Sequence, residues 1–170
     1  MARYTIFNGP MQTTAAGVAV TTGTAIKTML QVKPGATQTA TIVEWGISFD
    51  GSAAATPIKV ELIETDVAAT VTASAAADIT KADSDALNSG DPTTNMIAVG
   101  TTSTGYTATG EGTITAVRNL DAPQFIAPTN QFVKQFPLGR EPKIQPSKFA
   151  RIRVTAGAAV NCYCYMVIEV

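Results

Sequence analysis

Apolar and polar residues alternate with a period of two near the end of the chain, which predicts β-strands. Between Val160 and Val170 the even positions form one face, which carries Cys162 and Cys164, and the odd positions form the other. Residues 151–155 alternate in the same way. The link Ala156-Gly157-Ala158 is short enough for a hairpin turn, so we predict that these two strands are antiparallel neighbours.

The first half of the chain shows the same alternation. In residues 41–49 the odd positions carry the large side chains, so we expect that face, which includes Trp45, to be buried. A turn signal, Asp50-Gly51, separates this run from a second one at residues 58–63. Further strands are predicted at residues 3–8, 25–33, 112–120 and 130–136. Together these elements predict an all-β fold, an antiparallel β-sandwich or jelly-roll-like barrel of short strands.

Residues 66–112 break this pattern, because they are rich in Ala, Thr, Asp and Gly and contain few large apolar groups. We predict one long Ala/Thr/Gly-rich surface excursion there, with a strand at Met96–Val99. Loops of this length are usually functional or mobile. An Ala-rich run, Ser74–Leu87, could form a short helix, although its Ser, Thr and Asp residues disfavour one.

The pattern divides the chain into an N-terminal strand and arm, residues 1–23, and a single β-sandwich domain, residues 24–170. The arm would reach a neighbouring subunit, for which pairing with a sheet edge is a natural mode. The alternative is that residues 3–8 form the first strand of the parent sheet and that a plain loop follows.

Composition excludes several classes of function. The chain has no histidine, which excludes Ser-His-Asp triads, Cys-His dyads and His-ligated metals. The formal net charge is −1, whereas nucleic-acid-binding domains usually carry a strong basic excess. The sequence shows neither an apolar run long enough to cross a membrane nor the apolar segment of a signal peptide. We therefore expect no enzyme, no cofactor, no nucleic-acid or membrane partner, and synthesis in the cytoplasm.

The near-zero charge conceals two segments of opposite sign. Residues 44–111 contain ten acidic and two basic residues, a net of −8, and residues 118–153 contain seven basic and two acidic residues, a net of +5. The charges could intersperse in space if strands of both segments mix in one sandwich. Alternatively, the subunit is dipolar, and its acidic region meets a basic region of a neighbour.

No residue pattern supports a catalytic or metal site. Cys162 and Cys164 share the inward face of one strand, where they are poorly placed to bond each other, so we interpret them as reduced core residues rather than redox or metal groups. The acidic run Asp83-Ser84-Asp85, with Asn88 and Asp91, does not match the spacing of an EF-hand, and we interpret it as a solvated loop.

Six residues are candidates for an interface with another protein. Arg151 and Arg153 share one strand face, which is either a plain outer sheet face or a docking surface. Tyr163 and Tyr165 lie opposite the cysteines and either pack or form a subunit interface, where tyrosine is enriched. The other two candidates, Arg3 and Tyr4, belong to the predicted arm.

Three blocks of the sequence together resemble a family of tailed-bacteriophage virion proteins, the capsid decoration (cement) proteins. The blocks are Val43-Glu44-Trp45-Gly46-Ile47-Ser48-Phe49-Asp50-Gly51, Pro137-Leu138-Gly139-Arg140-Glu141-Pro142 and the run from Ala150 to Asn161. Their order and spacing also resemble that family, over roughly residues 15–170.

The resemblance implies a β-sandwich or jelly-roll-like protein that sits on the outside of the capsid, often as a homotrimer, and binds across neighbouring major capsid subunits. It carries over no catalytic residue. We therefore expect a non-enzymatic structural protein that stabilises the head. The alternative is a head-fibre or tail-associated module that binds host surface glycan. This alternative requires exposed aromatic side chains, and the predicted loops offer only Tyr106.

Overall fold

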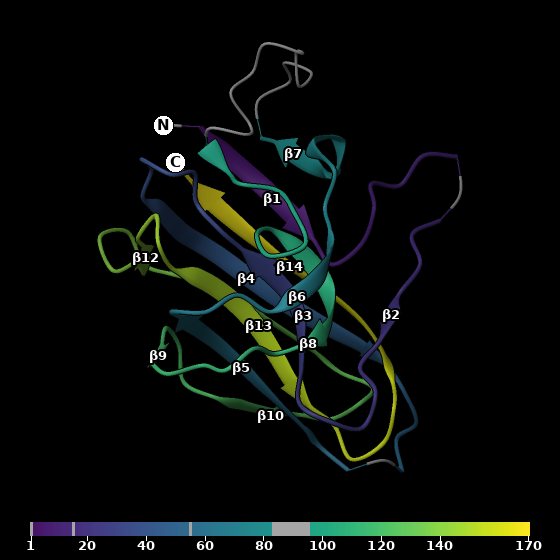
Figure 1. Cartoon of the computed structure of the whole chain (residues 1–170). Helices are drawn as coiled ribbons and strands as arrows, with labels where there is room; N and C mark the ends of the chain where they lie inside the picture. Colours follow the sequence, from purple (N-terminus) through teal and green to yellow (C-terminus); the bar gives the residue numbers. More distant parts are fainter. Residues whose placement is uncertain (1, 15, 55, 83–95) are drawn as a thin grey trace.

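The computed structural model describes residues 2–14, 16–54, 56–82 and 96–170. The described chain is almost entirely β, and two antiparallel sheets pack against each other as a sandwich (Figure 1). The predicted all-β class is therefore confirmed. Both termini lie at the same end of the sandwich, next to β1 and β14 (Figure 1).

We call the first sheet sheet A. Its central strands are β4 (Ala40–Asp50), β14 (Asn161–Glu169) and β1 (Arg3–Phe7). Its outer strands are β11 (Gln131–Gln135) beside β4, β7 (Ile79–Lys81) beside β1, β12 (Lys143–Ile144) beside β4 and β2 (Val20–Thr21) beside β14. A short 3-10 helix, η1 (Ala76–Asp78), precedes β7.

We call the second sheet sheet B. Its central strands are β5 (Ile58–Thr65), β13 (Phe149–Thr155) and β3 (Lys27–Val32). Beside β5 lie β10 (Gln124–Ile126) and β9 (Val117–Asn119), and beyond β3 lie β8 (Gly105–Gly110) and β6 (Thr70–Ala73).

The core fills the space between the two sheets, as the alternation predicts. Sheet A contributes Trp45, which is fully buried as expected, and both cysteines, which are free thiols. Sheet B contributes the apolar even positions of β5 and β13, among them Leu62 and Ile152. Burial raises the pKa of Cys162 to about 12 and that of Cys164 well above its usual value. Both thiols therefore stay protonated at neutral pH and pack as small apolar groups.

The predicted face of β4 is correct only in part. Trp45, Ile47 and Phe49 point into the core, but at the start of the strand Ile42 is buried instead of its odd-numbered neighbours. The pairing with β14 shifts between Val167↔Glu44 and Ile168↔Ile42. A β-bulge at Val43 therefore inserts one residue and reverses which face is buried.

The predicted hairpin of residues 151–155 with the last strand is wrong. β13 belongs to sheet B and β14 to sheet A, so residues 156–160 cross from one sheet to the other. Ala156 and Val160 are buried along this crossing. Because both strands have one apolar face, placing them in opposite sheets lets the two apolar faces meet across the core.

The N-terminal strand is not an arm. β1 lies between β14 and β7 of its own sheet, and both Tyr4 and Ile6 are buried. The alternative interpretation, a first strand of the parent sheet, is the correct one, because two alternate apolar residues gain more by filling the chain's own core.

The segment 66–112 contributes more structure than predicted. It supplies β6, β7 and β8 in addition to η1, and its Ile79 and Ile97 belong to the main core. Met96–Val99 forms only isolated bridges, Pro34↔Ile97 and Val99↔Thr104, rather than a strand. The first part of the suggested helix Ser74–Leu87 is η1 and β7, and residues 83–87 lie outside the described residues. Ile79 is the buried anchor that aligns this part with β1.

Candidate functional site

The outer face of sheet A carries a row of apolar side chains that the strand register aligns. Val133 of β11 pairs with Gly46 of β4, Gly46 pairs with Tyr165 of β14, and Tyr165 pairs with Phe7 of β1. Residues paired across neighbouring strands project from the same face. Val133 and Phe7 are exposed, with 54% and 39% of their surfaces accessible. The row is thus an apolar stripe across the sheet on the side away from the core.

Gly46 makes room for the tyrosine in this row. A Cβ atom at Gly46 would lie 2.6 Å from Cε1 of Tyr165, so the ring lies directly over the glycine backbone. The ring also contacts Phe7, with centroids 6.1 Å apart and planes tilted by 41°. Its hydroxyl donates a hydrogen bond to the Glu44 carboxylate. Burial, that hydrogen bond and the charge of Glu44 raise the pKa of Tyr165 to about 12.

The chain segment between β1 and β2 forms a wall beside this stripe. It leaves the sheet at Asn8, is held at Met11, whose backbone N–H donates to Asp78 Oδ1 at 2.8 Å, and rejoins sheet A at β2. Figure 1 shows this segment as the long loop that leads from β1 to β2. On its way back, Gly17 passes close to Tyr163, since a Cβ there would lie 2.6 Å from the tyrosine hydroxyl.

Wall and sheet together enclose a groove of about 610 Å³. We call it the sheet A groove and define it by Phe7, Met11, Val18, Val133, Tyr163 and Tyr165. Its remaining lining includes the polar side chains of Gln12, Ser48 and Gln131. None of the described residues that line it is charged. Its size and its largely apolar lining match those of ligand and peptide sites.

The predicted candidates Tyr163 and Tyr165 meet in this groove. Arg3 lies on the same outer face at the other end of β1, where it pairs with Glu169 at 3.8 Å. Tyr4, by contrast, is 1% exposed and points into the core. Its inclusion as an interface residue is therefore wrong, because a buried side chain cannot contact a partner.

The predicted candidates Arg151 and Arg153 lie on the outer face of sheet B. Arg151 is fully buried there under the chain's own loops, where its guanidinium donates to the backbone oxygens of Glu111 and Val67 and pairs with the Glu111 carboxylate at 3.3 Å. Its inclusion as a docking residue is therefore also wrong. Burial lowers its pKa, and the charge of Glu111 acts in the opposite direction. Through these hydrogen bonds Arg151 holds the segments that contain Val67 and Glu111 against sheet B.

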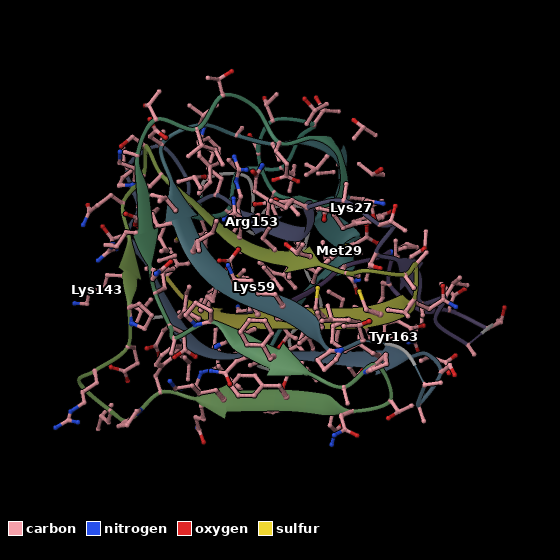
Figure 2. The ribbon with its side chains drawn as sticks, turned by 90° about the horizontal axis from the view of Figure 1, so that it is seen from below. Lys27, Met29, Lys59, Lys143, Arg153 and Tyr163 are labelled. Carbon is pink, nitrogen blue, oxygen red and sulfur yellow. The ribbon has the colours of Figure 1, made fainter. Side chains whose placement is uncertain are left out.

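Arg153 is partly accessible and pairs with Glu61 at 3.0 Å. Figure 2 shows it beside Lys59, which contacts the same carboxylate at 2.7 Å. Burial by itself would raise the pKa of Glu61, but the hydrogen bond from Lys59 and the charge of Arg153 lower it. Two cations thus hold one carboxylate, which is a structural arrangement rather than a free docking surface.

The two oppositely charged segments of the sequence mix in space. Among the described residues, three ion pairs join them: Arg153–Glu61, Arg151–Glu111 and Arg118–Glu64, the last at 2.9 Å. These pairs favour the first interpretation, in which charges intersperse within one sandwich. Strands β5 and β13, from opposite segments, are direct neighbours, and this pairing explains the mixing.

Sequence reasoning missed most of the groove. Phe7 and Val133 belong to predicted strands, but only the strand register shows that they flank Tyr165. The one available signal was Gly46 in the middle of an otherwise large-residue strand, since a glycine there often marks a close approach of another group. The acidic run from Asp83 to Asp91 lies outside the described residues.

Within the described ranges, no cluster of His, Cys, Asp or Glu side chains could hold a metal ion. No helix in that part of the chain has the length and apolar character of a membrane span. Comparison with known proteins adds no relative: no family model, no curated protein and no solved structure matches the chain.

Proposed function

We propose that this chain is a non-enzymatic structural protein of a tailed-bacteriophage virion, which binds the outside of the assembled capsid and stabilises it. Its partners are the major capsid protein and further copies of itself in a homotrimer, and it uses neither nucleic acid nor membrane. It is made in the bacterial cytoplasm and ends on the outer capsid surface. Binding only to the assembled lattice stabilises that lattice by mass action.

The observation that carries this proposal is the sheet A groove. It offers an uncharged, aromatic-lined contact surface on a sheet, and aromatic residues are enriched at protein–protein interfaces. The resemblance to decoration proteins supports the same function. Its first block is β4, the floor of the groove, and its third block is β13 with the crossing into β14.

The proposal is tested with heads that lack this protein. Purified chain is added to expanded heads, and the temperature of capsid melting is measured by scanning calorimetry. We expect saturable binding to the heads and a higher melting temperature. Unexpanded heads serve as a control and should bind fewer copies. Absence of binding, or binding that leaves the melting temperature unchanged, would refute the proposed stabilising role.

A second candidate, binding of host surface glycan by a head fibre or tail module, gains support from one feature of the groove. Tyr163 lines it together with the amide side chains of Gln12 and Gln131, and sugar sites combine aromatic rings with such polar groups. A glycan array separates the two candidates, because a decoration protein should give no signal above background.

A further inference from the structure

One edge of sheet A ends in a strand that lacks the usual protection against further pairing. Of the four strands that end the two described sheets, β6, β7, β10 and β11, the longest is β11 with five residues. An edge strand presents N–H and C=O groups to which another strand can bind, and proline, charge or a bulge usually blocks it. β11 contains no proline, its pairing with β4 shows no bulge, and its one charged residue, Lys134, is held by Asp121.

The hydrogen-bond pattern of β11 identifies the unpaired backbone groups. The Phe49 N–H donates to the Asn130 oxygen at 3.1 Å, and the Phe136 N–H donates to the Val43 oxygen at 2.9 Å. In an antiparallel pair, every second residue bonds to the neighbouring strand, so the even residues of β11 bond to β4. The N–H and C=O groups of the odd residues point away from β4, and no described residue bonds to them. These odd residues are Gln131, Val133 and Gln135.

The odd residues of β11 read the same in both directions, with Val133 at the centre of two glutamines. A second β11 strand can therefore approach antiparallel with Val133 opposite Val133. In this register Gln131 of each copy faces Gln135 of the other. Each odd residue then exchanges its N–H and C=O with an odd residue of the second copy. Every other register pairs fewer of these groups, so the strand fits a second copy of itself in one position.

The side chains of β11 are compatible with this register. All three odd side chains are exposed and uncharged, and glutamine amides can hydrogen-bond each other across paired strands. On the other face of the strand, Lys134 would face Phe132 of the second copy, so no like charges meet. A register centred on Lys134 would instead oppose two ammonium groups, which is destabilising. The side chains therefore favour the same register as the backbone.

We propose that two copies of this chain bind each other edge to edge, β11 against β11, with a two-fold axis at Val133. The contact is isologous, because both copies use the same surface. It joins the two copies of sheet A into one continuous sheet, and the apolar row from Phe7 to Val133 continues into the row of the second copy. The inference goes beyond the proposed function, since a two-fold contact does not close a trimer but links copies of neighbouring trimers.

The first experiment measures self-association of the isolated chain by sedimentation velocity over a range of protein concentrations. We expect the unaltered chain to show a reversible step in which two identical particles combine. Val133→Pro removes an N–H that β4 does not use, and edge strands accept proline at such positions. It should weaken the step about tenfold or more, because both copies lose a donor at the axis. Val133→Thr is the matched control, since it keeps the N–H and the β-branched shape, and it should associate like the unaltered chain.

The second experiment tests the register with charges at the two-fold axis. Val133→Lys and Val133→Glu each place like charges opposite each other, so neither variant should associate with itself. An equal mixture brings opposite charges together, and we expect the association step to return. Val133 is exposed, so the fold should tolerate both substitutions, and circular dichroism checks the fold of every variant. This experiment also decides the question if Val133→Pro does not fold.

Three results would overturn the edge contact. The first is an unaltered chain that shows no association step at any concentration. The second is a folded Val133→Pro chain that associates as strongly as the unaltered one. The third is a mixture of the two charged variants that associates no better than either variant alone. The calorimetry on heads measures binding to a different partner, so the edge contact can fail while the proposed function holds, and the reverse.

Discussion

Asn8 shows how a single residue lets the chain leave a sheet without breaking it. Its backbone N–H donates to the Cys164 oxygen at 3.0 Å, and its side-chain oxygen accepts the Cys164 N–H at 2.9 Å. Its side-chain nitrogen donates to the Cys162 oxygen at 3.2 Å. The amide thus takes the place of the next strand residue, so that the wall of the groove can begin at Gly9.

We predict that Asn8→Ala destabilises the fold by about 1–3 kcal/mol, because it leaves a buried N–H and a buried C=O of β14 unpaired. Urea denaturation measures the change in the free energy of unfolding. The control is Asn161→Ala at the exposed start of the same strand, which should cost less than about 0.5 kcal/mol. Equal effects of the two substitutions would contradict this role of Asn8.

Asp66 accepts hydrogen bonds that should make the stability of the fold depend on pH in the acidic range. Hydrogen bonds from the Thr115 side chain and the Ala116 backbone lower the pKa of Asp66 from 3.8 to about 2. A lowered folded-state pKa contributes stability above the unfolded value, and that contribution is lost as the pH falls through the folded value. We therefore predict that the free energy of unfolding decreases between pH 4 and pH 2, and that Asp66→Asn removes part of this decrease.

Urea denaturation at several acidic pH values measures this effect. Asp50→Asn, at the exposed end of β4, is the control. Its free energy of unfolding should fall with decreasing pH as steeply as that of the unaltered chain. If the free energy of unfolding depends on pH in the same way for the unaltered chain and both variants, Asp66 is not the group responsible.

At the level of elements, Gly46 is the position where β4 and the groove meet. Gly46→Ala places a methyl group against the Tyr165 ring, and we predict a loss of about 1–3 kcal/mol from overpacking. Gly110→Ala in β8 is the matched control, because no atom lies within 4 Å of a Cβ there. Thermal unfolding compares the two. If Gly110→Ala lowers the melting temperature as much as Gly46→Ala does, the loss comes from replacing a strand glycine and not from contact with the Tyr165 ring.

The alternation in the sequence predicts the strands well but not their partners. It places β4, β5, β13 and β14 close to their observed positions, because each has one apolar face. It cannot detect the bulge at Val43, which depends on the pairing of β4 with β14. It also cannot distinguish a hairpin from a crossing at residues 156–160, since either arrangement buries the same residues.

The burial of Arg151, a predicted interface residue, likewise depends on contacts between distant parts of the chain. Arg151 alternates with apolar residues, as an exposed arginine of a strand also would. Only the fold brings the backbone oxygens of Glu111 and Val67 within hydrogen-bonding distance of its guanidinium. Tyr163 and Tyr165 could be proposed because they share one strand face. Phe7 and Val133 could not be joined to them, because they come from strands far apart in the sequence.

At the level of the whole molecule, the two outer faces differ. On the outer face of sheet B the chain's own loops cover Arg151, and the charged residues Arg151, Arg153 and Glu61 form internal ion pairs. The outer face of sheet A carries the uncharged groove. The uncharged groove makes the outer face of sheet A the surface that the proposed attachment to a capsid would use.

The most direct test of this account is cryo-electron microscopy of the parent particle. We predict density for the two-sheet sandwich on the outer surface of the capsid, in groups of three, with sheet A facing a neighbouring copy or the shell. Particles that lack this chain serve as the control and should lose that density. Density found only at the neck or on the tail, or none on the particle, would contradict the account.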